Sequence, residues 1–158
     1  VKHFREFLPK TVDERVIHSA PCSVDASDAD ISDRLKPFFD DYALQTEAGK
    51  VNELRDRLRT GHFAIAGVHD TLEQLQEGKV ESLVIARDFH KDGTQCTRCS
   101  FYLDRANGQC PYCGGDLRNG VDLVESMIRL ATSQEGEVQF VDSRPIEDLH
   151  GVGALHKF

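Results

Sequence analysis

Apolar side chains recur at intervals of three and four residues along much of the chain, and this spacing predicts amphipathic helices. One helix is expected to begin near Ser27 or Asp28, because both residue types favour the N-cap position. Pro37 lies inside its apolar pattern, so a kink or a break is expected there. A second helix is predicted over residues 47–60, since Gly61 follows at the position where helices commonly end.

Two shorter helices are expected where acidic residues stand three apart at the start of an apolar pattern, an acidic form of the capping box. Asp70 and Glu73 open the first of them, and Gly78 is expected to close it. Asp122 and Glu125 open the second. Both helices would bury one apolar face.

A near-continuous apolar run over residues 80–86 is typical of a strand that is buried on both faces of an α/β sheet. Further strands are expected over residues 138–141 and after the glycine loop at residues 151–153, and another could begin at residues 16–18. Helices and strands therefore alternate. The predicted fold class is α/β, with helical layers around a sheet.

The composition is that of one ordinary domain of 158 residues, with a formal net charge of −8. No apolar run is long enough to cross a bilayer and no signal peptide is recognised, so we expect a cytoplasmic protein without a membrane partner. The acidic balance disfavours binding to DNA or RNA phosphates, which relies on Lys and Arg. The sequence starts without Met, and residues 1–11 are interpreted as a linker from a preceding domain.

Four of the five cysteines form two C-x-x-C pairs that are separated by ten residues. Each pair can supply two thiolates to a tetrahedral Zn²⁺ ion. The spacer contains Asn107 and has the length of a short β-hairpin, which predicts a zinc-binding hairpin inserted over residues 90–121. Four cysteine ligands leave no open position, so the Zn²⁺ is expected to be structural. The predicted metal ligands are Cys96, Cys99, Cys110 and Cys113.

Disulfides or a redox-active C-x-x-C are the alternatives for these cysteines. The odd total disfavours a disulfide framework, and thioredoxin-type sites do not occur as facing pairs. Cys22 stands alone in a polar loop and is interpreted as a plain side chain. The seven histidines are dispersed, no nucleophile accompanies them, and no phosphate-cradling loop is found. We therefore predict no catalytic and no cofactor-binding residues, and no enzyme.

Three segments, taken in their order and spacing, resemble the C-terminal domain of archaeal and eukaryotic class-1 peptide chain release factors. They are residues 67–85 (GVHDTLEQLQEGKVESLVI), residues 122–125 (DLVE) and residues 151–155 (GVGAL). The resemblance covers roughly residues 12–158, and its first segment is the most specific. A bacterial group of release-factor-like proteins shares this domain. Some archaeal members carry a paired C-x-x-C zinc hairpin between the same strand and helix.

This resemblance implies a three-layer sandwich related to the kink-turn RNA-binding ribosomal proteins. In release factors the domain chiefly docks a translational GTPase. The Gly-Gly-Gln of the peptidyl-hydrolysis domain is absent, because Gly114 and Gly115 are followed by Asp116. Kink-turn binders also place a lysine at the start of the helix that begins here near His69. That lysine is missing, and the neighbouring acids would repel phosphate.

The expected function is a non-catalytic protein-interaction domain of a release-factor-like translation termination or ribosome-rescue protein. It would dock a GTPase or the ribosome, and meet RNA through the ribosome. Two alternatives remain open. One is an RNA-binding module that uses Arg55, Arg57 and Arg59, although acids alternate with these arginines. The other is a regulatory zinc-ribbon protein outside translation.

Overall fold

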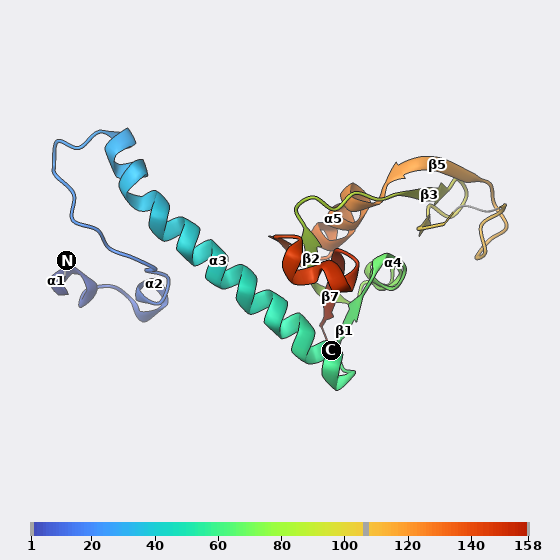
Figure 1. The fold of residues 1–158 in the computed structure, drawn as a ribbon, viewed down its shortest axis with the longest axis horizontal. Coiled ribbons are helices and arrows are strands. Elements are labelled where there is room, and N and C mark those ends of the chain that lie inside the picture. The colour runs from blue at the N-terminus through green and yellow to red at the C-terminus, as the bar shows by residue number, and fades with distance from the viewer. Residues whose placement is uncertain (1, 106–107, 158) are drawn as a thin grey trace. The chain divides into compact units, whose positions relative to one another are not determined.

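The computed structural model describes residues 2–105 and 108–157, and Figure 1 shows the order of the elements. The chain divides into two compact units, residues 1–46 and residues 47–158. Helix α3 (Asp28–Thr60) contributes residues to both units. Among the described residues, no helix combines the length and the apolar character needed to cross a membrane.

The first unit is helical, with α1 (Lys2–Arg5), α2 (Lys10–Asp13) and the beginning of α3. A reciprocal capping box starts α3, because Ser27 Oγ accepts from the Asp30 amide at 3.3 Å and Asp30 Oδ2 accepts from the Ser27 amide at 3.1 Å. The expected start is thereby confirmed. The strand considered at residues 16–18 is wrong: this segment is irregular, since no described strand pairs with it.

Helix α3 runs without interruption through Pro37. The break expected there is wrong, and residues 47–60 are the later part of α3, not a separate helix. A proline removes one backbone donor from the helical ladder. The stretch between Phe38 and Thr46 has neither glycine nor proline to end the helix. The later part of the helix buries one side, with Val51 and Leu54 both in the core.

A four-stranded sheet in the order β1-β7-β2-β6 forms the centre of the second unit. Its strands are β1 (Ala64–Ala66), β2 (Val80–Ala86), β6 (Glu137–Val141) and β7 (Val152–His156). Strand β2 pairs in parallel with β6 and antiparallel with β7. The predicted central strand is therefore confirmed, as are the two strands expected after it.

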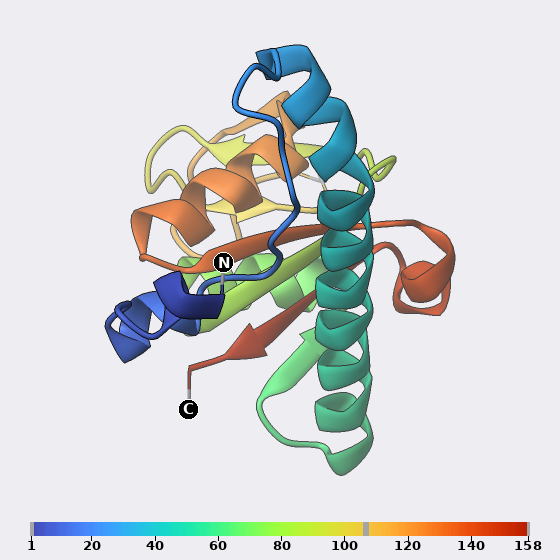
Figure 2. The same cartoon turned by 90° about the vertical axis from the view of Figure 1, so that its left-hand side faces the viewer.

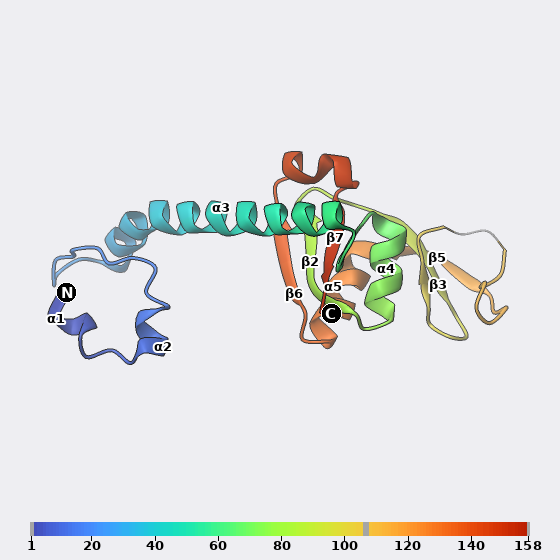
Figure 3. The same ribbon diagram turned by 90° about the horizontal axis from the view of Figure 1, so that it is seen from below.

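Helices cover both faces of this sheet, which gives the predicted three layers. On one face α4 (Val68–Gln76) and α5 (Leu123–Ser133) pack through Leu72 and Met127 against Leu83 of β2. On the other face Leu54 of α3 and Ile146 of the 3-10 helix η1 (Arg144–Leu149) pack against the sheet. In Figure 2 the later half of α3 crosses in front of the strands, and Figure 3 shows α5 and α4 to the right of β6 and β2.

The two predicted capping boxes have different outcomes. Asp122 caps α5 as expected, because its Oδ1 accepts from the amides of Val124 at 2.8 Å and Glu125 at 3.1 Å. Asp70 does not cap α4, which begins earlier, at Val68. Its N-cap is Gly67 at φ 93° and ψ 157°, a conformation open essentially to glycine alone. The backbone geometry at Gly67 thus sets the start of α4.

Candidate metal centre

The four predicted cysteine ligands lie together in a small second sheet between β2 and α5. This sheet has the order β4-β3-β5, with β3 (Asp92–Cys96), β4 (Tyr102–Leu103) and β5 (Leu117–Asp122). We call residues 90–121 the cysteine ribbon. The four Sγ atoms all lie within 4.8 Å of one another, and they form the one such group found among the described residues that could hold a metal ion.

The distances between the sulfur atoms agree with a tetrahedral metal site. Cys96 Sγ lies 3.4 Å from Cys113 Sγ, and Cys99 Sγ lies 3.7 Å from Cys110 Sγ. A Zn–S bond of about 2.3 Å gives a tetrahedron edge of about 3.8 Å, whereas a disulfide bond is only about 2.0 Å long. All four thiols are free. The donor set and its spacing therefore fit a four-coordinate thiophilic ion, and they do not fit two disulfides.

The two C-x-x-C turns repeat one backbone pattern. In the first turn Ser100 N–H donates to the Cys96 carbonyl at 3.0 Å, and in the second Gly114 N–H donates to the Cys110 carbonyl at 2.8 Å. The donors occupy equivalent positions and have similar dihedral angles, with φ 62° at Ser100 and 68° at Gly114. The two turns thus present their cysteine pairs to the same centre as near copies of each other.

Gly115 is required by close packing rather than by its dihedral angles. A Cβ atom there would lie 2.7 Å from Arg98 Cβ, 3.2 Å from Cys96 Sγ and 3.3 Å from Cys113 Sγ. A side chain would therefore push the two turns apart. The second glycine after Cys113, noted in the sequence, allows the turns to approach each other.

Backbone amides also set the charge of the sulfur atoms. The amides of Arg98 and Cys99 each donate to Cys96 Sγ at 3.4 Å, and chiefly the Cys99 amide lowers the pKa of Cys96 to about 6. At Cys99 the Phe101 amide lowers the thiol pKa, but burial and hydrogen bonds with the other cysteines outweigh it and raise the pKa to about 12. One sulfur ionises readily while its neighbour retains a proton. A bound dication would favour ionisation of all four.

The described ends of the spacer between the two turns pair with residues outside the spacer. Tyr102 and Leu103 in β4 pair with β3 across the first turn, and Gln109 forms a bridge with Asp116 across the second. Asn107, which was expected at the hairpin turn, lies outside the described residues. Each end of the spacer therefore closes its own cysteine turn.

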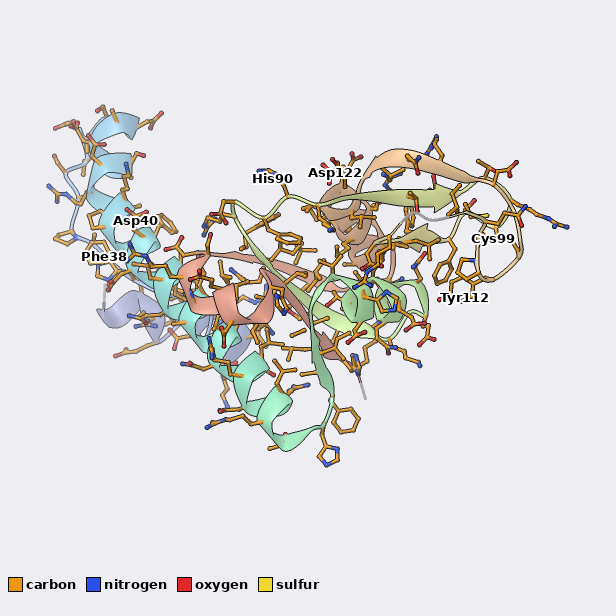
Figure 4. All side chains as sticks on the ribbon, turned by 45° about the vertical axis from the view of Figure 1, so that its right-hand side comes forward. Phe38, Asp40, His90, Cys99, Tyr112 and Asp122 are labelled. Carbon is orange, nitrogen blue, oxygen red and sulfur yellow. The ribbon has the colours of Figure 1, made fainter. Side chains whose placement is uncertain are left out.

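Helix α4 holds the ribbon through side chains that the sequence did not single out. The Gln76 side chain bonds both backbone groups of Tyr102: its Oε1 accepts from the amide at 2.6 Å, and its Nε2 donates to the carbonyl at 3.1 Å. One turn earlier Glu73 Oε1 accepts from the Tyr112 hydroxyl at 3.3 Å. Figure 4 shows Tyr112 beside Cys99 at the far end of the ribbon. The position of Tyr112 between the two cysteines of the second C-x-x-C is a signal that could have found it, and nothing comparable marks Gln76.

The other candidate groups do not assemble into a site. Cys22 is exposed, belongs to the first unit and is not a member of the four-cysteine cluster. His69 Nδ1 lies 3.1 Å from Asp104 Oδ1 and so links the start of α4 to the ribbon. Arg57 pairs with Glu53 at 2.6 Å, and Arg59 pairs with Asp56. These pairs confirm that acids compensate the arginines proposed for RNA binding.

Comparison with solved structures identifies the fold. No protein-family model matches the chain, and no curated protein sequence is similar to it. The C-terminal domain of a peptide chain release factor from Methanosarcina mazei superposes with a TM-score of 0.60 at 20% identity, covering 85% of this chain and 98% of that one. Pelota from Archaeoglobus fulgidus gives 0.54 at 17% identity, covering 99% of this chain and 45% of that one.

A third structure, ribosome-bound archaeal Pelota with ABCE1, gives a TM-score of 0.57 at 16% identity, covering 90% of this chain and 34% of that one. The chain thus spans less than half of each Pelota chain and nearly all of the isolated release factor domain. Its fold is that of the C-terminal domain of release factors and Pelota, as the resemblance implied.

Proposed function

We propose that this chain is a non-catalytic docking domain of a release-factor-like protein that acts in translation termination or ribosome rescue. The observation that supports the proposal most is the match to nearly the full length of a solved release factor C-terminal domain. The resemblance assigns residues 12–158 to this domain, residues 1–11 to a linker and residues 90–121 to an insertion. The compact unit of residues 47–158 is its body.

The partner of this domain is a translational GTPase or the ribosome. The GTPase partner is inferred from the resemblance to class-1 release factors, in which this domain docks a translational GTPase. The ribosome is supported by the similar fold of Pelota, which has been described bound to ribosomes with ABCE1. Both partners place the protein in the cytoplasm.

Cys96, Cys99, Cys110 and Cys113 hold a structural Zn²⁺ ion in this proposal. Zinc prefers four thiolates in a tetrahedron, and the distances between the sulfur atoms match that geometry. With all four positions taken by cysteine, the ion supplies rigidity and charge to the ribbon and has no place for a substrate. The metal orders the two turns, and the surface of the ribbon depends on that order.

RNA binding is the weaker alternative because of the charges near the start of α4. A cavity of about 360 Å³ there is lined by Lys91 and Arg105, but also by Asp70 and Asp104. The mixed charges offer phosphate no net attraction. The other alternative, a regulatory zinc-ribbon protein outside translation, would explain only the cysteine ribbon. A release-factor-like domain explains both the ribbon and the body.

Affinity capture from a lysate of the source organism tests the proposal, with the zinc-loaded chain as bait and nuclease treatment as a control. We expect a translational GTPase or ribosomal proteins to be recovered after nuclease treatment. Cys99→Ser separates the role of the ribbon from that of the body, and Cys22→Ser is the matched control outside the cluster. Recovery that depends entirely on RNA, or of no translation component, would contradict the proposal.

A further inference from the structure

The end of the cysteine ribbon carries an exposed aromatic side chain that is held in one place. Tyr112 lies between the two cysteines of the second turn and is 55% exposed, the highest value among the large apolar side chains of described residues 47–157. Its ring packs on Phe101, with centroids 4.2 Å apart and an interplanar angle of 47°. Its hydroxyl donates to Glu73 of α4 at 3.3 Å. An exposed ring fixed at two points is prepared for binding.

Both acidic and basic side chains lie near Tyr112: Glu73 accepts from its hydroxyl, and Arg98 donates to the neighbouring Cys113 carbonyl at 3.3 Å. Burial raises the pKa of its hydroxyl, and Glu73, Cys110 and Glu77 raise it further. A tetrathiolate zinc centre also carries a formal charge of about −2, from a dication and four thiolates. The face of an aromatic ring is itself electronegative. The two carboxylates and the thiolate centre outnumber Arg98, so the surroundings of Tyr112 favour a cation over phosphate.

The shape of this region excludes an enclosed small molecule. The hollow between α4 and the ribbon, which Phe101, Tyr112 and Glu73 help to line, has a volume of only about 10 Å³. Ligand pockets are usually at least about 300 Å³. A ligand here must lie on the outer surface, as a single side chain of a larger partner does.

We propose that Tyr112, Phe101 and Glu73 form a docking surface for an arginine side chain on an extended segment of a protein partner. A guanidinium group can stack on the tyrosine ring and donate to the Glu73 carboxylate with the same planar group. Lysine provides only the charge. The inference rests on the proposed function solely for the identity of the partner, because the chemistry of the surface is independent of it.

NMR titration of the ¹⁵N-labelled, zinc-loaded full chain tests this surface, with a blocked Gly-Arg-Gly peptide as the probe. The matched ligand is the same peptide with citrulline, which keeps the shape of arginine and lacks its charge. We expect saturable shifts at Tyr112, Phe101 and Glu73, with the arginine peptide binding about three- to tenfold more tightly than the citrulline peptide. Added salt should reduce this difference.

Tyr112→Leu should abolish these shifts, and Glu73→Gln should weaken binding severalfold. Tyr42→Leu is the control, since Tyr42 is a similarly exposed tyrosine (50%) on α3. Zinc content and the remaining amide spectrum show whether each variant keeps its fold. Equal binding of the two peptides, unchanged binding by Tyr112→Leu, or stronger binding of single-stranded oligouridine at Tyr112 would overturn the inference. Arginine binding without capture of a translation component would instead refute only the proposed function.

Discussion

The attachment of the ribbon to the body through Gln76 leads to a quantitative prediction. The side chain makes two hydrogen bonds to the backbone of Tyr102, at 2.6 and 3.1 Å, and this region is partly buried. Gln76→Met keeps a side chain of similar length and removes the amide oxygen and nitrogen that form these two hydrogen bonds. The Tyr102 amide and carbonyl then remain in place without acceptor or donor.

A net hydrogen bond contributes about 0.5–1.5 kcal/mol, so the loss of two should lower the free energy of unfolding by about 1–3 kcal/mol. Urea unfolding of the zinc-loaded chain measures this value. Hydrogen exchange measures the local effect, because the Tyr102 amide has Gln76 Oε1 as its acceptor. We expect that amide to exchange at least about fivefold faster in the variant, as a loss of about 1 kcal/mol implies.

Gln74→Met provides the matched control on the same helix. Gln74 donates to Glu77, an exposed contact within α4, so this substitution should change the free energy of unfolding by less than about 0.5 kcal/mol. If Gln76→Met changes the free energy of unfolding by no more than this control, or if the Tyr102 amide keeps its protection from exchange, Gln76 does not hold the ribbon.

Three further predictions concern the metal centre and the body. Cys99→Ser should lower the bound zinc, measured by elemental analysis, from one equivalent to well below one, whereas Cys22→Ser should leave it unchanged; equal losses would contradict the ligand assignment. Gly115→Ala should weaken zinc binding in a chelator competition, because its Cβ would lie 2.7 Å from Arg98 Cβ; unaltered affinity would show that the turns can move apart freely. Burial, with a smaller contribution from Lys79, lowers the pKa of His156 below 6.5, so the unfolded chain takes up a proton first and stability falls as the pH drops below about 6.5. Urea unfolding between pH 7.5 and 5 should show His156→Gln gaining stability relative to the parent chain, and a difference independent of pH would refute this assignment.

The sequence was most informative where one local rule decides the outcome. The apolar run of β2 could be placed because a strand buried on both faces has no polar alternation. Asp122 could be assigned as an N-cap because its side chain satisfies neighbouring amides. The four cysteines could be grouped because their spacing fixes two turns, and the structure places their sulfur atoms within 4.8 Å of one another.

Other features depend on residues that are distant in the sequence. Gly67 sets the start of α4, and its amide donates to the carbonyl of Val152 at 2.9 Å, a contact that no local pattern reveals. Gln76 meets Tyr102 only because the ribbon folds back onto α4. The continuity of α3 through Pro37 does not follow from the local pattern either, because the proline removes one backbone donor and the rest of the helix compensates for that loss.

Cross-linking mass spectrometry in lysate of the source organism would test the docking function most directly. It reports which proteins lie against residues 47–158 and which positions they contact. The proposal predicts cross-links from this unit, including residues of α4 or the ribbon, to a translational GTPase or to ribosomal proteins after nuclease treatment. Cross-links only to proteins outside translation, or none from this unit, would contradict it.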